Sequence, residues 1–272
     1  MILSIVIITH NEEANIVRTL ESVKSLISEG RGEIIVVDSG STDRTVEIAQ
    51  SFGAKTFVEE WKGYAAQKNS AIDKASGDWI LSLDADESLE PELASLLAGS
   101  ATLAKVGSAE WCLTMNRGDI KEQPVGFWFP RKNFFLGRWI RHGGFWPDRK
   151  LRLFRRGGGR FKNAAVHETL EIAGPTAVIQ HALIHNSYPT LSDYIEHMNR
   201  YSSLGAEMAV ANGQRGTVIN IVVRPLLTFV YNYFLRLGFL DGREGLLLHL
   251  YHAVYVSWKY AKVWELGQAR ME

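Results

Sequence analysis

The sequence predicts an α/β protein built on a doubly wound sheet with parallel strands, followed by a helical C-terminal region. Short apolar runs alternate with segments of helical periodicity from Leu3 to Gly99. Polar and acidic loops follow these runs, as at the ligand-binding edge of open α/β sheets. From Leu191 onward, long apolar segments indicate helices. We therefore expect a first domain at residues 1–188 and a helical region at residues 189–272.

Three apolar runs are predicted as buried strands: Leu3–Ile8, Ile34–Val37 and Trp79–Leu83. Ala54–Val58 is predicted as a further short strand. Helices are expected between them, and they include Arg44–Phe52 and Gly63–Lys74. Asn11 is predicted to cap the first helix, and Thr42 or Asp43 the second. Because such strands run in parallel, the loops that follow them should meet at one edge of the sheet.

After Gly99 the regular alternation ends. Further strands are expected at Glu110–Met115, Val125–Phe135, Lys150–Phe154, Ala165–Ile172 and Ala177–Ile184. Aromatic residues alternate here with Arg and Lys, a composition suited to binding anions or sugars. An aromatic core under a basic surface explains the same pattern.

Charge is unevenly distributed although the net charge is +0. Residues 1–100 contain 8 basic and 17 acidic residues, whereas residues 117–162 contain 13 basic and 3 acidic ones. The basic segment indicates a phosphate-rich partner or a solvated face. The single cysteine, Cys112, excludes an intrachain disulfide and a multi-cysteine metal site. With a strand-like run at the start and no apolar leader, we expect a cytoplasmic protein.

The C-terminal segments Leu191–Asn212, Thr217–Leu240 and Gly245–Trp264 are predicted as helices. The longest uncharged stretch among them, Gly245–Trp258, has 14 residues, which span about 21 Å and cannot cross a bilayer core of about 30 Å. Aromatic and basic residues are frequent in these segments. We expect peripheral contact with the inner face of the cytoplasmic membrane, with a buried helical hairpin or a dimer contact as the alternative.

Asp84 and Asp86 follow the predicted strand Trp79–Leu83. Two carboxylates separated by one residue on extended backbone point to the same side and repel each other, and a divalent cation bound to phosphate oxygens relieves this repulsion. The alternative is a solvated turn in which Glu87 and Glu90 begin a helix.

Four segments carry a resemblance to a known family: Thr9–Glu12, Val36–Asp43, Gln67–Asn69 and Leu83–Asp86. In this order and spacing they resemble the family 2 inverting glycosyltransferases of the GT-A fold. Residues 145–185 are similar to the subgroup that includes the bacterial lipopolysaccharide core glucosyltransferases. The resemblance implies transfer of a hexose from a nucleoside-diphosphate sugar to a membrane glycolipid or lipopolysaccharide core, with glucose and a UDP-linked donor favoured. It also implies Mg²⁺ or Mn²⁺ as cofactor.

The resemblance further implies residue roles. The donor nucleotide would be bound by residues of the first two loops and the third helix, namely Thr9, Asn11, Glu12, Asp38, Gln67 and Asn69. A polar helix face explains Gln67 and Asn69 equally well. Asp84 would face the ribose or a metal-bound water, and Asp86 would bind the metal.

Residues of the second half would complete the site. The general base would be Asp148, where Pro147 replaces the first acid of the family's acidic pair, or Glu168. His167 would be a further metal ligand or a structural residue. Arg152 and Arg155 would contact the diphosphate or an acceptor phosphate.

Other classes of protein are less consistent with the sequence. A sugar nucleotidyltransferase requires a glycine-rich loop after its first strand, and residues 9–13 contain no glycine. A nucleic-acid-binding protein is disfavoured because the basic segment accompanies an acidic pocket. A catalytically inactive nucleotide-sugar-binding or membrane scaffold protein stays open as the alternative to an enzyme.

Overall fold

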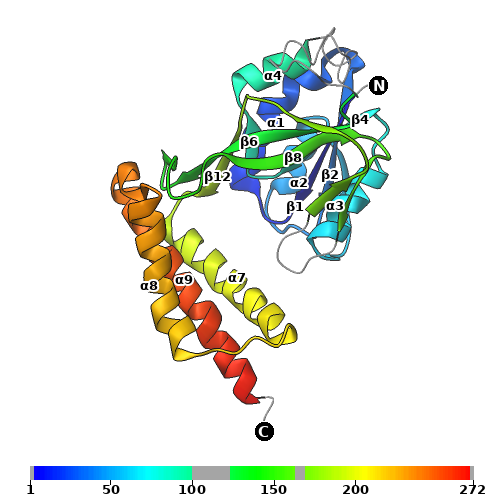
Figure 1. Cartoon of the computed structure of the whole chain (residues 1–272). Helices are drawn as coiled ribbons and strands as arrows, with labels where there is room; N and C mark the ends of the chain where they lie inside the picture. The colour runs from blue at the N-terminus through cyan, green and yellow to red at the C-terminus, as the bar shows by residue number, and fades with distance from the viewer. Residues whose placement is uncertain (1–2, 100–122, 163–168, 270–272) are drawn as a thin grey trace. The chain divides into compact units, whose positions relative to one another are not determined.

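A computed structural model of the chain describes residues 3–99, 123–162 and 169–269 (Figure 1). The predicted strand at 110–115 and the candidates His167 and Glu168 lie outside these ranges. Contacts divide the chain into two compact units. The first comprises Met1–Arg131 and Arg149–His185, and the second Lys132–Asp148 and Asn186–Glu272.

The first unit contains the predicted parallel strands. They are β1 (Leu3–Thr9), β2 (Gly32–Asp38), β3 (Lys55–Val58) and β4 (Trp79–Asp84). Their spatial order is β3-β2-β1-β4, and every pairing among them is parallel. The connecting helices are α1 (Glu13–Ile27), with the 3₁₀ turn η1 (Ser28–Gly30), α2 (Thr45–Ser51) and α3 (Tyr64–Asp73). This part of the expected fold is confirmed.

The complete sheet is mixed rather than parallel. Strand β8 (Asp148–Arg155) runs antiparallel to β4, with Leu153 opposite Leu81. Beyond β8 lie β6 (Gly126–Phe135), β12 (Leu183–Tyr188) and β5 (Glu87–Leu89), in that order. Two short strands, β7 (Arg138–Trp139) and β11 (Thr176–Val178), pair with β6. The strand expected at Ala177–Ile184 is therefore two strands.

Helices cover the two faces of the parallel strands in the first unit. On β1, Leu3, Ile5 and Ile7 pack on the face that carries α1, α2 and α4 (Pro91–Ala98). Val6 points to the opposite face, which α3 covers together with the hairpin of β9 (Gly159–Lys162) and β10 (Thr169–Ile172). Burial on both faces explains why β1, β2 and β4 are apolar without alternation. Strand β3, at the edge of the sheet, is mostly exposed.

The predicted cap of the first helix is wrong. Helix α1 begins at Glu13 with Glu12 as its N-cap residue, and no side chain caps it. Asn11 instead has a positive φ of 55°, a conformation that Asn tolerates, and its Oδ1 accepts a hydrogen bond from Thr42 N at 2.8 Å. The predicted cap of the second helix is also wrong, because Arg44 is the N-cap residue of α2 and no side chain caps it. Asp43 lies one residue earlier, and its Oδ1 accepts from Thr45 N at 3.0 Å.

The second unit is mainly helical (Figure 1). Its long helices are α7 (Leu191–Ala211), which starts with a Thr190–Asp193 capping box, and α9 (Gly242–Ala269). The segment expected as one helix from Thr217 consists of a π-helical turn η2 (Ile219–Val223), α8 (Arg224–Val230), a second π-helical turn η3 (Tyr231–Leu235) and a 3₁₀ turn η4 (Gly238–Asp241). Within the described ranges, no helix is long and apolar enough to cross a membrane.

Candidate active site

The ends of three parallel strands define the candidate site in the first unit. Thr9 at the end of β1 is paired with Asp38 at the end of β2, and Ile8 is paired with Asp84 at the end of β4. Thr9 Oγ1 donates to Asp38 Oδ2 at 2.8 Å. The loops after β1, β2 and β4 therefore begin at the same edge of the sheet, where α/β proteins bind ligands.

Asp38 organises the loop after β2. Its side chain is fully buried, and its Oδ1 accepts from the backbone N–H groups of Gly40 at 2.9 Å and Ser41 at 2.7 Å. Ser41 Oγ donates to Asp38 Oδ2 at 2.5 Å. Because both carboxylate oxygens accept hydrogen bonds from this loop, Asp38 fixes the conformation of the loop, and its contact with a nucleotide stays a prediction.

Asp84 is held between two cationic side chains. Lys68 Nζ lies 2.7 Å from its Oδ1, and Arg152 Nη2 donates to its Oδ2. Lys68 and Arg152 are themselves almost inaccessible to solvent. Burial alone would raise the pKa of Asp84, but the charges of Arg152 and Lys68 outweigh it and hold this pKa well below its usual range. Asp84 is therefore ionised, and both its oxygens already face a cation.

Glu87 supports this arrangement from inside the protein. Its carboxylate is fully buried, and its Oε1 accepts from Arg152 Nη2 at 2.8 Å and from Arg131 Nη1 at 2.9 Å. Its Oε2 accepts from the backbone N–H of Asp84 at 3.2 Å. Glu87 thus connects the backbone of Asp84 with the guanidinium group that contacts the Asp84 side chain.

Asp86 faces a histidine. His185 Nε2, on β12, lies 3.1 Å from Asp86 Oδ2, and His185 is paired with Glu87 in the β5–β12 ladder. Both side chains remain partly accessible, at 28% for Asp86 and 15% for His185. Burial raises the pKa of Asp86, whereas the charge and hydrogen bond of His185 lower it, and the net effect is a pKa below the usual value.

The Asp86–His185 pair fits a divalent cation better than Asp84 does. It offers a carboxylate oxygen and an imidazole nitrogen close together, whereas the Asp84 oxygens are engaged by Lys68 and Arg152. In the described part of the chain, no group of three or more His, Cys, Asp or Glu residues could hold a metal ion.

Glu12 belongs to the same acidic edge. Burial raises the pKa of its carboxyl group, a hydrogen bond from Asn15 Nδ2 at 3.0 Å lowers it, and the charge of Asp86 raises it further, with a net upward shift. Concentrated negative charge of this kind favours a cation or a donor of hydrogen bonds.

The two polar residues predicted on the third helix differ. Gln67 is fully buried, and its amide nitrogen and oxygen have no hydrogen-bond partner among the described residues. Asn69, in contrast, is bonded at both ends to the backbone of Phe161, with Nδ2 to O at 2.8 Å and Oδ1 to N at 2.9 Å. Asn69 therefore anchors β9, and its predicted contact with the nucleotide stays a prediction.

The two predicted arginines also differ. Arg152 lies between Asp84 and Glu87, whereas Arg155 is paired with Trp79 at the opposite end of β4. Five residues along a strand correspond to about 16 Å. The exposed Arg155 guanidinium lies 5.0 Å from the Trp79 ring. This geometry argues against a contact between Arg155 and a donor bound at Asp84.

The base candidates lie elsewhere in the described structure or outside it. Asp148 belongs to the second unit, where Asn133 Nδ2 donates to its Oδ2 at 3.1 Å. Glu168, like the possible ligand His167, lies outside the described residues. The roles of all three stay predictions.

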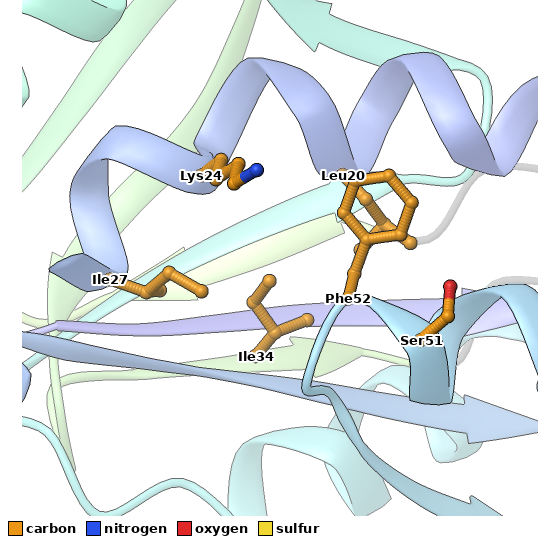
Figure 2. Close-up of a pocket in the computed structure, with 6 residues that line it drawn as sticks. All are labelled: Leu20, Lys24, Ile27, Ile34, Ser51 and Phe52. Carbon is orange, nitrogen blue, oxygen red and sulfur yellow. The ribbon is translucent and has the colours of Figure 1, made fainter.

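A pocket elsewhere in the first unit does not involve the predicted site. It lies between α1, β2 and the end of α2, and Figure 2 shows its six lining residues: Leu20, Lys24, Ile27, Ile34, Ser51 and Phe52. The lining is mostly apolar and contains none of the acidic residues described above.

The fold is similar to that of a solved transferase. The mannosyltransferase PcManGT from Pyrobaculum calidifontis, solved in complex with GDP-Man and Mn²⁺, matches 96% of this chain over 86% of its own, with a TM-score of 0.51 and 15% sequence identity. At this identity the similarity concerns the fold alone, a GT-A-like mixed α/β sheet followed by C-terminal helices.

Sequence comparisons identify the family. The profile described as "Glycosyl transferase family 2" matches residues 4–157. The lipopolysaccharide core biosynthesis glycosyltransferase LpsC of Rhizobium meliloti (strain 1021) is 30% identical over 97% of this chain and 92% of its own length. The low-salt glycan biosynthesis hexosyltransferase Agl6 of Haloferax volcanii is 38% identical over 38% of this chain and 26% of its own. The chain belongs to glycosyltransferase family 2, and the predicted membership is confirmed.

Sequence reasoning missed four residues of the site: Lys68, Glu87, Arg131 and His185. Lys68 lies between two polar residues that were considered, and Glu87 follows Asp86 directly, so their positions next to the motifs were the available signal. Arg131 and His185 are brought to the site by the pairing of distant strands, and no local pattern distinguishes them from other basic residues.

Proposed function

We propose that this protein is an inverting hexosyltransferase that transfers a sugar, with glucose favoured, from a UDP-linked donor to a membrane glycolipid or lipopolysaccharide core. The proposal rests on one observation in this family 2 chain: Asp38, Asp84 and Asp86 are grouped at the carboxyl edge of the parallel strands. The similarity to LpsC over nearly the whole chain supports the choice of acceptor class.

The residues of the first unit would bind the donor. The loop that follows the buried Asp38 and the acceptor oxygens of Glu12 would contact the nucleoside, whose ribose hydroxyls and uracil N–H donate hydrogen bonds. Asp86 and His185 would hold Mg²⁺ or Mn²⁺, which neutralises charge on a departing nucleoside diphosphate. Lys68 and Arg152 would keep Asp84 ionised, and Glu87 would hold Arg152 and the Asp84 backbone in position.

An inverting transfer also needs a base that takes the proton of the acceptor hydroxyl. Asp148 and Glu168 are the candidates that we propose. Asp148 opens β8, the strand that also carries Arg152, and its carboxylate already accepts a hydrogen bond from Asn133.

The proposal is tested by incubating the full chain with a panel of nucleotide sugars and Mg²⁺ or Mn²⁺, and measuring released nucleoside diphosphate. We expect Asp86→Asn to lower kcat/KM by about 100-fold, or about 3 kcal/mol of transition-state stabilisation. Asp73→Asn is the matched control, because Asp73 is an exposed carboxylate of the same unit that pairs with Arg160. Release that is unchanged in Asp86→Asn would contradict the proposed metal role.

The same assay separates the base candidates and the alternative function. If only one of Asp148→Asn and Glu168→Gln loses activity to the extent of Asp86→Asn, that residue is the base. If the wild-type chain binds UDP but releases none from any donor in the presence of a lipid-linked acceptor, the inactive scaffold is the better description.

A further inference from the structure

An uncovered apolar stripe runs along the helical segment that contains α8, in the second unit. It consists of five pairs of neighbouring residues that recur every four positions, from Val218–Ile219 through Leu226–Leu227 to Phe234–Leu235. All ten side chains are between 43% and 76% exposed. Single exposed apolar residues are normal on a protein surface, but a contiguous row of this length marks an interaction surface.

The two π-helical turns keep this stripe on one side of the helix. In an α-helix of 3.6 residues per turn, a four-residue repeat drifts around the axis by about 40° at each step. A π-helical turn contains more residues and therefore offsets the drift. The turns η2 (Ile219–Val223) and η3 (Tyr231–Leu235) flank α8 on both sides. The helix geometry therefore fits the four-residue repeat of the sequence.

The rest of the second unit covers only the other side of this segment. Helix α9 lies between α7 and α8 (Figure 1). Ile221 packs into a small core that α7 and α9 form around Ala206 and Val263, and Ile221 O accepts from Ser257 Oγ at 2.8 Å. Pro225 is buried as well. The segment is thus fixed in the unit by one side, and the stripe faces outward.

The charged residues near the stripe indicate which kind of partner it binds. Between Glu207 and Asp241 the sequence contains no acidic residue, but it contains Arg215, Arg224 and Arg236, which are exposed. The Arg236 guanidinium lies over the ring of Tyr231, a member of the stripe, at 5.6 Å. A symmetric contact with a second copy would place these arginines together without an acidic partner from the segment. Anionic lipid headgroups above an apolar layer complement both features.

We infer that the stripe from Val218 to Leu235 is a docking surface for an anionic lipid bilayer, in which the helix lies in the plane of the interface. The apolar pairs enter the upper acyl region, and Arg215 and Arg236 contact headgroup phosphates. The Arg224 guanidinium lies over the ring of Tyr260 on α9, at 4.9 Å. This inference rests on the proposed function for its purpose, because a membrane glycolipid acceptor would then be presented at the same surface. It depends on residues separate from the donor site.

The test is flotation of the full chain with vesicles of phosphatidylcholine, with and without phosphatidylglycerol. We expect the wild-type chain to float with the anionic vesicles, and Leu226→Glu with Leu227→Glu to reduce the bound fraction about tenfold. Val17→Glu, which places the same charge at an exposed apolar position on α1, is the control and should float like the wild type. Arg215→Gln with Arg236→Gln should weaken binding to the anionic vesicles.

Three results would overturn the inference. The first is failure of the wild type to float with anionic vesicles, and the second is flotation of the Leu226/Leu227 variant to the same extent as the wild type. The third is a dimer, detected by light scattering, that this variant dissociates, because a second copy would then cover the stripe. Donor hydrolysis measured without vesicles keeps the two proposals apart. Flotation without nucleotide release contradicts only the proposed function, and release without flotation contradicts only the docking surface.

Discussion

Replacement of Glu87 by Gln tests the buried charge arrangement behind the acidic edge. Gln keeps the size of the side chain and removes its charge. Because Glu87 is fully buried and accepts from Arg131 and Arg152, the substitution leaves two guanidinium groups with less negative charge in the protein interior. Removing one partner of a buried ion pair typically costs 3–5 kcal/mol, so we expect the free energy of unfolding to fall by about 3 kcal/mol or more.

Thermal unfolding followed by circular dichroism measures this effect. For a chain of this size, a loss of about 3 kcal/mol corresponds to a decrease in Tm of about 6–12 °C. The matched control removes an exposed ion pair: Asp73 and Arg160 are each 57% exposed, and Asp73→Asn should change stability by less than about 1 kcal/mol. If the Tm of Glu87→Gln lies within about 2 °C of the wild-type value, the charge of Glu87 does not stabilise the buried arginines as its contacts indicate.

Two further predictions concern acid stability. Burial raises the pKa of Glu33, but hydrogen bonds from Lys55, Ser76 and Ser4 outweigh it and lower this pKa from 4.5 to about 2. The stability that ionised Glu33 gives the folded protein is therefore complete above pH 4.5 and is lost as the pH falls toward 2. Glu33→Gln should therefore be less stable than the wild type at pH 7, by about 3 kcal/mol at most, and this difference should vanish in urea titrations near pH 2. Burial lowers the pKa of His249 from 6.5 to about 4, with a smaller contribution from His252 and against the opposing charge of Asp241. The folded state therefore excludes a proton that the unfolded chain binds. Stability should fall as pH decreases from 6.5 to 4, and His249→Leu should reduce this slope, with a remainder from His252, whose pKa burial also lowers. An unchanged slope would contradict the burial of the neutral ring.

The parallel half of the fold was predictable from sequence because its signals are local. Strands β1, β2 and β4 are short apolar runs, and α1 has apolar residues at helical spacing. The position of Asp84 at the end of β4 followed directly from this pattern. The antiparallel insertion of β8 next to β4 did not, since the pairing of Leu81 with Leu153 is a long-range contact with no local signature.

The site was predictable in its location and less so in its contacts. The aspartates were identified because strand-end loops meet at one edge, whereas the partners of these aspartates depend on three-dimensional packing. Asn69 illustrates the limit: its polar side chain on a helix suggested a ligand contact, but it binds the Phe161 backbone. The π-helical turns were missed for a different reason, because a four-residue apolar repeat also fits an ordinary amphipathic helix.

The central claim is that the acidic edge binds a nucleoside diphosphate together with a cation held by Asp86 and His185. Calorimetric titration of UDP into the full chain, with and without Mn²⁺, tests it most directly. We predict that Mn²⁺ tightens UDP binding about tenfold or more in the wild type and in Asp73→Asn, and that it has no effect in Asp86→Asn or His185→Ala. Tightening by Mn²⁺ in these two variants to the same extent as in the wild type would contradict the claim.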